Sequence, residues 1–94
     1  MVFIVYNEAI WDEIDECLTR CEIESYTLVP TLHGKGRLSG PHMGTHIWPA
    51  TNSALLIACE DEKVRHILEE VSKLKSSMKK VGVRAFVMPL EDMV

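Results

Sequence analysis

The hydrophobic and polar residues of this 94-residue chain follow two spacings, and the changes between them mark the expected elements. The β-branched and aromatic run "VFIVY" (residues 2–6) predicts a central buried strand. Apolar residues then recur at helical spacing, which predicts a helix over residues 8–21 with Asn7 as its N-cap. Acidic side chains near the start of this helix suit the positive end of its dipole.

The next two apolar runs predict strands of different character. "SYTLVPTL" (residues 25–32) contains Pro30, which cannot donate a hydrogen bond to a neighbouring strand. We therefore expect an edge strand or a bulge there. "SALLIACE" (residues 53–60) is apolar enough to be buried on both faces of a sheet.

A second helix and a last strand complete the pattern. Asp61 is expected to cap the helix, and Gly82 lies just past its end. "VRAFVMP" (residues 83–89) predicts the last strand. The helix is predicted from one apolar stripe at helical spacing, which consists of Val64, Ile67, Leu68, Val71, Leu74 and Met78.

The order strand, helix, strand, strand, helix, strand predicts an α+β, ferredoxin-like βαββαβ sandwich. Two βαβ halves with right-handed crossovers give a four-stranded antiparallel sheet with both helices on one face. Residues 1–94 then form a single domain. Because the first and third strands are apolar throughout, we expect a partner chain to cover the other face.

Composition and charge exclude several classes of protein. The chain is 47% hydrophobic and 26% charged, as in an ordinary soluble globular domain. Its net charge of −4 argues against nucleic-acid binding, which favours basic domains. No apolar run reaches the roughly 18 residues that a membrane span needs. No basic residue precedes the first apolar run, so we expect no signal peptide, no membrane insertion and a cytoplasmic protein.

Three cysteines without a Cys-x-x-Cys motif do not suggest a disulfide framework. Cys17 and Cys21 lie four residues apart on the first helix, and we interpret them as small core residues, with metal ligation as the alternative. No serine–histidine–aspartate or cysteine–histidine arrangement and no Walker-type loop stands out, so we expect no enzyme.

Residues 33–52, "HGKGRLSGPHMGTHIWPATN", differ from the rest of the chain. They contain four of the five glycines and three of the four histidines. The segment is too long for a hairpin turn, and loops of this length inside a compact domain are usually functional or disordered.

Two stretches resemble the PII signal-transduction proteins, a family related to CutA. "SYTLVPTLHGKGRLSG" resembles the second strand and T-loop entrance, where a strand ends in a Gly-x-Gly-Arg turn before a long loop. "VGVRAFVMPLEDMV" is similar to the last strand of the family, and "EDEKVRHILEEVSKL" stands where its second helix begins. The resemblance implies a PII-like homotrimer with effector sites in the clefts between subunits. It also implies a loop that carries the signal to a target protein, which would be an enzyme, a transporter or a regulator.

In this family adenine nucleotides bind beneath the loop. Glycine amides can approach a phosphate closely and a guanidinium can clamp it. The resemblance therefore implies an effector site for an adenine nucleotide or another anion, formed by Gly34, Lys35, Gly36, Arg37, Gly82 and Arg84.

The chain departs from the family pattern at several places. Val83 replaces a glycine, Arg84 stands in for the usual lysine, and residues 33–52 contain no tyrosine for uridylylation. The basic C-terminal segment of the family has no counterpart. The resemblance is therefore to a short PII-like protein with a truncated T-loop, rather than to a sensor of ATP together with 2-oxoglutarate.

Two alternative functions use other residues or no ligand. His33, His42 and His46 cluster in the loop, and imidazoles suit divalent transition metals, so a metal-responsive protein is one alternative. Solvated or partner-contacting histidines are the plainer interpretation. Met43 and Trp48 are candidate contacts with the target, although Trp48 also suits packing within the assembly. A trimeric adaptor without a ligand is the other alternative.

Overall fold

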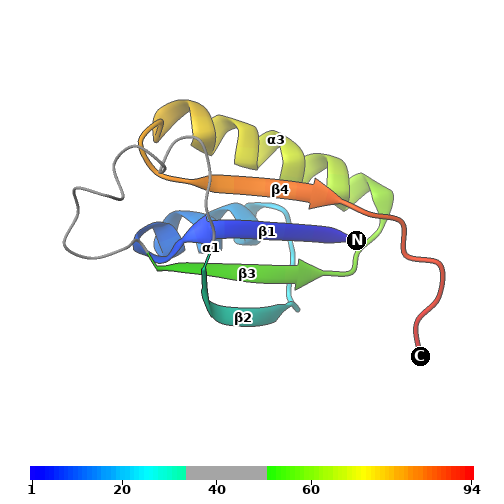
Figure 1. Ribbon diagram of the computed structural model, residues 1–94. Helices are drawn as coiled ribbons and strands as arrows, with labels where there is room; N and C mark the ends of the chain where they lie inside the picture. Colours follow the sequence, from blue (N-terminus) through cyan, green and yellow to red (C-terminus); the bar gives the residue numbers. More distant parts are fainter. Residues whose placement is uncertain (34–50) are drawn as a thin grey trace.

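The computed structural model describes residues 1–33 and 51–94, which form an antiparallel sheet with two helices on one face (Figure 1). The strand order is β2-β3-β1-β4, which confirms the expected ferredoxin-like α+β fold. Neither described helix is long and apolar enough to cross a membrane. The elements are β1 (Val2–Asn7), the 3-10 turn η1 (Glu8–Ile10), α1 (Trp11–Arg20), β2 (Thr27–Leu32), β3 (Asn52–Ile57), α3 (Asp61–Ser77) and β4 (Val83–Val87).

The first helical segment begins where the sequence predicts, but with a tighter turn. The side chain of Asn7 accepts a hydrogen bond of 2.8 Å from the backbone N–H of Ala9, which confirms its role as N-cap. The 3-10 turn η1 follows, and α1 begins only at Trp11. Short 3-10 turns at helix starts are common. The predicted helix over residues 8–21 is therefore at the correct position, but its first three residues form a 3-10 turn rather than an α-helix.

The predicted cap of the second helix is wrong. Glu60 has the extended backbone of an N-cap, with φ −71° and ψ 158°, and Asp61 is already the first residue of α3. The side chain of Glu60 makes no capping hydrogen bond. Asp61 and Glu62 still occupy the first turn, where a negative charge interacts favourably with the helix dipole.

Strands β3 and β4 are shorter than predicted. β3 ends at Ile57, because the chain turns away from the sheet at Ala58 towards α3, and the sequence pattern continues to residue 60. β4 ends at Val87, although Met88 still exchanges backbone hydrogen bonds of 2.8 and 2.9 Å with Met1. The contact between β4 and the start of the chain therefore extends one residue beyond the assigned strand.

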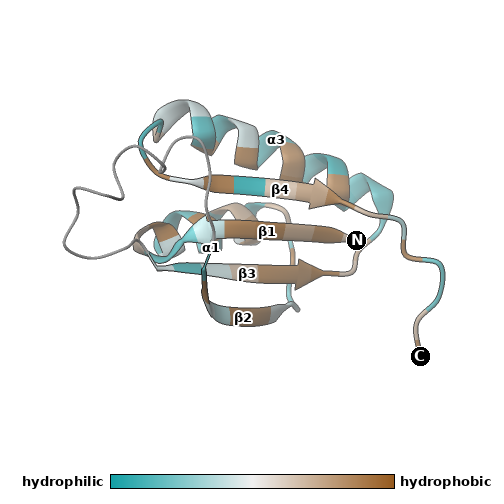
Figure 2. Ribbon diagram, in the orientation of Figure 1, coloured by the Kyte–Doolittle hydropathy of each residue, from teal (hydrophilic) through white to brown (hydrophobic). Residues whose placement is uncertain are grey.

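The core lies between the sheet and the helices, where the apolar stripes of α1 and α3 face one side of the strands (Figure 2). Val2, Ile4 and Tyr6 of β1 point to this side and are at most 2% exposed. The buried Cys17 and Cys21 are free thiols, which agrees with their interpretation as core residues.

The opposite side of the sheet is apolar and only partly covered. Phe3 and Val5 of β1 are half-buried there in the single chain, and coverage of this face by a partner chain stays a prediction. We call this surface the open face, and the register places on it Phe3, Val5, Thr27, Val29, Ala54, Leu56, Arg84 and Phe86.

The edge strand β2 contains the irregularity that Pro30 predicts. β2 ends the strand order, and its register with β3 shifts between Val29 and Leu32. Within this bulge Thr31 has φ 58°, a left-handed conformation that a β-branched residue rarely adopts. Thr31 therefore stores strain beside the start of the 33–52 segment.

We predict that Thr31→Gly raises the free energy of unfolding by about 1 kcal/mol. Relief of the left-handed conformation gains roughly 1–3 kcal/mol, and the flexibility of glycine offsets about 0.5–1 kcal/mol of that gain. Urea unfolding at a fixed protein concentration measures the change. The control, Thr27→Gly, makes the same substitution in the regular part of β2, where we expect a loss of stability. A loss at both positions would contradict the assignment of strain to Thr31.

One ion-pair cluster joins the two helices across the core edge. The Nε of Arg20 on α1 donates to Glu70 Oε1 on α3 at 2.5 Å, and the Nζ of Lys73 donates to Glu70 Oε2 at 3.3 Å. The Glu70 side chain is only 14% exposed, whereas those of Arg20 and Lys73 are 56% and 76% exposed. The hydrogen bond from Arg20 lowers the pKa of Glu70 below its usual value, and desolvation opposes this effect.

We predict that Glu70→Gln destabilises the protein at neutral pH and that the loss shrinks in acid. Because the pKa of Glu70 is lower in the folded than in the unfolded chain, its contribution is complete above about pH 4.3 and disappears as pH falls through the folded pKa. Urea unfolding between pH 3 and 7 measures this difference. Glu69→Gln, which removes an exposed neighbouring carboxylate, controls for net charge. A loss that stays constant to pH 3 would contradict the role of the ionised carboxylate.

Candidate functional site

Four strand ends meet at one end of the sheet. β1 ends at Asn7, which lies opposite Asn52 at the start of β3, and Leu32 at the end of β2 also pairs with Asn52. Tyr6 lies opposite Val83, the first residue of β4. Both ends of the 33–52 segment and the predicted second phosphate-binding turn therefore lie at the same end of the sheet (Figure 1).

Backbone hydrogen bonds hold Gly82 and the end of the 33–52 segment to the end of β1. The N–H of Asn7 donates to the carbonyl oxygen of Gly82 at 3.0 Å, and the N–H of Glu8 donates to that of Thr51 at 2.9 Å. A Cβ placed on Gly82 would meet no atom of the described residues within 4 Å. As far as residues 1–33 and 51–94 are concerned, Gly82 leaves room for an approaching group, such as a phosphate or a neighbouring chain.

Arg84 is exposed and lies on the open face, opposite Val5 and two residues before Phe86. Within residues 1–33 and 51–94, no carboxylate forms an ion pair with it. A guanidinium at such a position can donate two parallel hydrogen bonds to a phosphate or carboxylate. Gly82 and Arg84, which are two residues apart in the sequence, are the predicted effector residues that lie in the described part of the chain.

The remaining predicted site residues divide between described and undescribed positions. His33 is exposed and directly follows β2. In the described part of the chain, no three His, Cys, Asp or Glu side chains are arranged to hold a metal, and the metal site stays a prediction. The others lie outside the described residues: Gly34, Lys35, Gly36, Arg37, His42, Met43, His46 and Trp48.

A buried polar cluster at this end of the sheet is absent from the sequence-based predictions. Tyr6 and Ser53 lie opposite each other on the helix side of β1 and β3 and are 2% and 3% exposed. Ser53 Oγ donates to Glu8 Oε1 at 2.8 Å. Burial raises the pKa of the Tyr6 hydroxyl, and a hydrogen bond with Ser53 partly opposes this. These contacts fix the start of β3 against the turn before α1.

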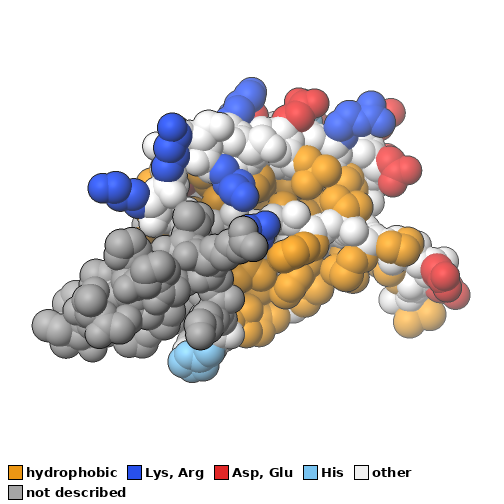
Figure 3. Space-filling model, turned by 45° about the horizontal axis from the view of Figure 1, so that its top comes forward, with side chains coloured by type: hydrophobic (Ala, Val, Ile, Leu, Met, Phe, Trp, Pro, Cys, Tyr) orange, Lys and Arg blue, Asp and Glu red, His pale blue; other side chains and the backbone are white. Residues whose placement is uncertain are grey.

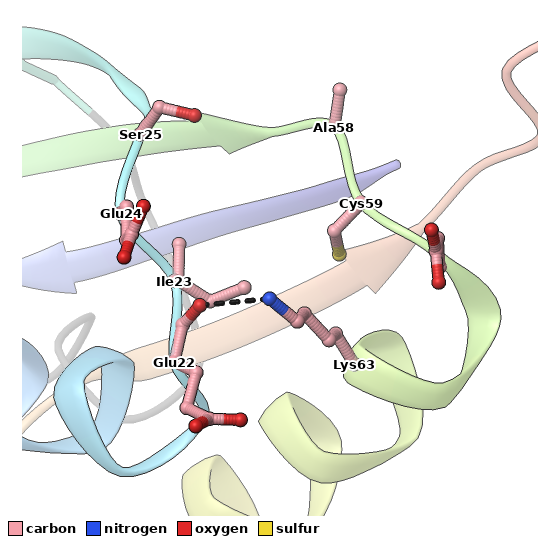
Figure 4. A pocket seen from close by; sticks show the side chains of 8 residues that line it. Glu22, Ile23, Glu24, Ser25, Ala58, Cys59 and Lys63 are labelled. Atoms are coloured by element: carbon pink, nitrogen blue, oxygen red, sulfur yellow. Dashed lines mark hydrogen bonds between the residues drawn. The ribbon is translucent and has the colours of Figure 1, made fainter.

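A cleft of about 490 Å³ lies at the opposite end of the sheet and contains no predicted effector residue (Figure 4). Its walls are the connections from α1 to β2 and from β3 to α3. The side chain of Lys63 reaches across the cleft, and its Nζ donates a hydrogen bond to the carbonyl oxygen of Glu22 at 2.9 Å. Burial raises the pKa of the Cys59 thiol, which therefore stays protonated at neutral pH. The cleft is lined by Glu22, Ile23, Glu24, Ser25, Ala58, Cys59, Glu60 and Lys63.

Solved structures of PII-like proteins share this fold. CPII from Thiomonas intermedia K12, bound to ADP and bicarbonate, is 22% identical with a TM-score of 0.65, over 90% of this chain and 80% of that one. CPII bound to ADP, AMP and bicarbonate is 18% identical with a TM-score of 0.66, over 99% and 92% of the two chains. A putative PII-like signaling protein from Thermus thermophilus is 21% identical with a TM-score of 0.63, over 90% and 79%.

The sequence comparisons agree with the fold. No curated protein matches the chain. The family described as nitrogen regulatory protein P-II matches residues 1–94. Since this match extends from the first to the last residue of the sequence, the chain belongs to the nitrogen regulatory protein P-II family.

Proposed function

We propose that this protein is a PII-type regulator that binds an adenine nucleotide between the subunits of a homotrimer and controls a target protein through residues 33–52. The family match over residues 1–94 supports the regulatory class, without catalysis, and we place the protein in the cytoplasm. The observation that carries the site is the position of Arg84, which lies on the open face at the end of the sheet where residues 33–52 begin and end.

The open face supports self-assembly. Phe3 and Phe86 pack with ring centroids 6.1 Å apart, yet Phe86 remains 47% exposed. Figure 3 shows hydrophobic side chains gathered over the sheet, next to the C-terminal segment. Complete burial of one phenylalanine side chain contributes roughly 1.5–3 kcal/mol, and contiguous apolar patches of this kind usually mark interfaces. Copies of the same sheet are suitable partners because their open faces are equally apolar.

Arg84 connects assembly to ligand binding. It shares the open face with Phe86, so packing of a second sheet there places the guanidinium beside a neighbouring subunit. Lys35 and Arg37 follow the end of β2 within five residues in the sequence, and in this proposal they contribute positive charge to the same site. An anionic ligand would thus be held between chains by charge-assisted hydrogen bonds, while Gly34, Gly36 and Gly82 permit close approach of phosphate oxygens.

ADP and AMP are the nucleotides we propose, because CPII is bound to both in solved structures. Bicarbonate, which accompanies them in CPII, is a second candidate anion. Regulation then follows from population shift: a ligand that contacts one conformation of residues 33–52 better than others favours that conformation. The target protein binds one of these conformations preferentially.

We predict that Arg37→Ala combined with Arg84→Ala weakens ADP binding at least about tenfold and leaves the oligomer intact, since each charge-assisted hydrogen bond contributes roughly 1.5–3 kcal/mol. Isothermal titration calorimetry measures the dissociation constant. Arg65→Ala removes an exposed arginine from α3 and serves as the control. An unchanged ADP affinity in the double variant would rule out this site.

We predict that Phe86→Lys converts the protein to monomers. Three copies would each place a charged ammonium in an apolar interface, which costs several kcal/mol for each ion. Sedimentation equilibrium measures the mass of the particle in solution. We expect this mass to fall from that of three 10.7 kDa chains to that of a single chain.

The matched control for this change is Leu28→Lys. Leu28 is 46% exposed, almost as much as Phe86, but it lies on the helix side of the edge strand β2. This variant should remain trimeric. A wild-type protein that is already monomeric at micromolar concentration would contradict the proposed assembly.

A further inference from the structure

Positive charge without compensating acids gathers where α3 meets β4. No aspartate or glutamate occurs between Val71 and Leu90, although the chain as a whole has a net charge of −4. Figure 3 shows lysine and arginine side chains at both ends of α3 and acidic side chains towards one end only. The acidic residues of α3 are confined to its first ten residues, whereas lysines continue to the end of the helix and beyond it. We call the exposed residues Lys75, Lys79 and Lys80 the lysine tip.

The backbone presents two of these lysines on a fixed turn. α3 ends with a hydrogen bond of 2.9 Å from the Met78 N–H to the Leu74 carbonyl oxygen. The N–H of Val81 then donates to the Met78 carbonyl oxygen at 3.1 Å, so Lys79 and Lys80 are the central residues of a β-turn.

Both flanks of this turn are anchored. Met78 and Val81 pack against the hydrophobic core, and the carbonyl oxygen of Gly82 accepts the bond from Asn7 described above. The turn therefore projects two adjacent ammonium groups into solvent from a held backbone. Pre-organised charges lose less conformational freedom on binding than charges on a loose segment.

The lysine tip has no acidic partner among the described residues. The three ion pairs among the described residues involve Arg20 and Lys73 as the basic partners. None of them involves Lys75, Lys79 or Lys80. Asp12 and Glu13 begin α1 at the same end of the molecule and pair with none of the three lysines. Lys75 suits the negative end of the α3 dipole, but Lys79 and Lys80 lie beyond the C-cap, Met78. Helix stabilisation therefore accounts for one lysine rather than three.

We propose that the lysine tip binds an acidic segment of the target protein, next to the contact made by residues 33–52. This inference rests on the proposed function, because it assigns the chemistry of the partner that the regulator controls. The location supports it, since the turn leads directly into Gly82 and Val83 at the end of the sheet where residues 33–52 begin and end. Charge complementarity of this kind selects partners and accelerates their association.

A protein segment fits the lysine tip better than the other anionic macromolecules. Recognition of anionic membranes typically uses clusters of about four to eight basic residues, and the tip of each chain has three. Nucleic-acid-binding domains are usually basic with a pI above about 9, whereas this chain has a pI of about 5.5. A run of a few aspartates or glutamates needs only a small patch of lysines.

The test uses the full-length protein and a fluorescein-labelled peptide of alternating glutamate and serine, with a glutamine–serine peptide as the uncharged match. Fluorescence anisotropy at low salt measures binding. We expect Lys79→Ala combined with Lys80→Ala to weaken the glutamate peptide about tenfold, and high salt to abolish binding to the wild-type protein. Lys63→Ala combined with Arg65→Ala removes the same charge from the other end of α3 and should leave peptide affinity unchanged. Equal losses in both double variants, or no binding to the wild type, would overturn the inference.

ADP titrations of the same variants separate this inference from the proposed function. We expect the Lys79/Lys80 variant to bind ADP within about twofold of the wild type, because its lysines lie outside the nucleotide site. A parallel loss of ADP and peptide affinity would assign both lysines to the nucleotide site, which overturns the inference and leaves the proposed function standing. Failure of the wild type to bind ADP would contradict the nucleotide site while the peptide result stands on its own. Binding of phosphatidylglycerol vesicles that depends on the lysines, without peptide binding, would replace the protein partner with a membrane.

Discussion

The apolar residues of β1 alternate between the two faces of the sheet, and α1 and α3 cover only one of these faces. β1 pairs with both β3 and β4, so its side chains lie in the central part of each face of the sheet. A monomer of this fold would leave Phe3, Val5 and Phe86 in contact with water. A chain of this size buries only about 60–65% of its unfolded surface, and self-association is an effective way to bury more. In the proposed trimer, coverage of the open face therefore determines both the stability of the protein and the position of the ligand site.

The sequence is sufficient to predict the order of the elements, because each has a distinct hydrophobic period. Asn7 and Pro30 are also predictable, since N-capping and the missing backbone donor of proline are properties of single residues. The cap of α3 is not, because an acidic residue is equally favourable at the N-cap and in the first turn, and Asp61 occupies the latter. The end of β3 escapes prediction for a related reason, since Ala58 and Cys59 continue the apolar pattern after the chain has left the sheet.

Some features of the candidate site can be predicted from the sequence, and others are visible only in the structure. Alternation along β4 is enough to place Arg84 and Phe86 on one face, but only the pairing register shows that this face is the one without helices. The contacts among Tyr6, Ser53 and Glu8 join residues up to 47 positions apart, and no local signal indicates them. The helical stripe in the sequence extends to Met78, and only the structure shows that Lys79 and Lys80 lie on a turn beyond the helix. Long-range register thus carries the functional information that periodicity lacks.

The central claim is that copies of the sheet cover the open face and that the nucleotide lies between them. A crystal structure of the protein with ADP tests this claim most directly. The account predicts three chains packed through their open faces, with the Arg84 guanidinium within hydrogen-bond distance of a phosphate oxygen and a second chain also contacting the nucleotide. An ADP molecule held within one chain, with Arg84 in solvent and the open face uncovered, would contradict it.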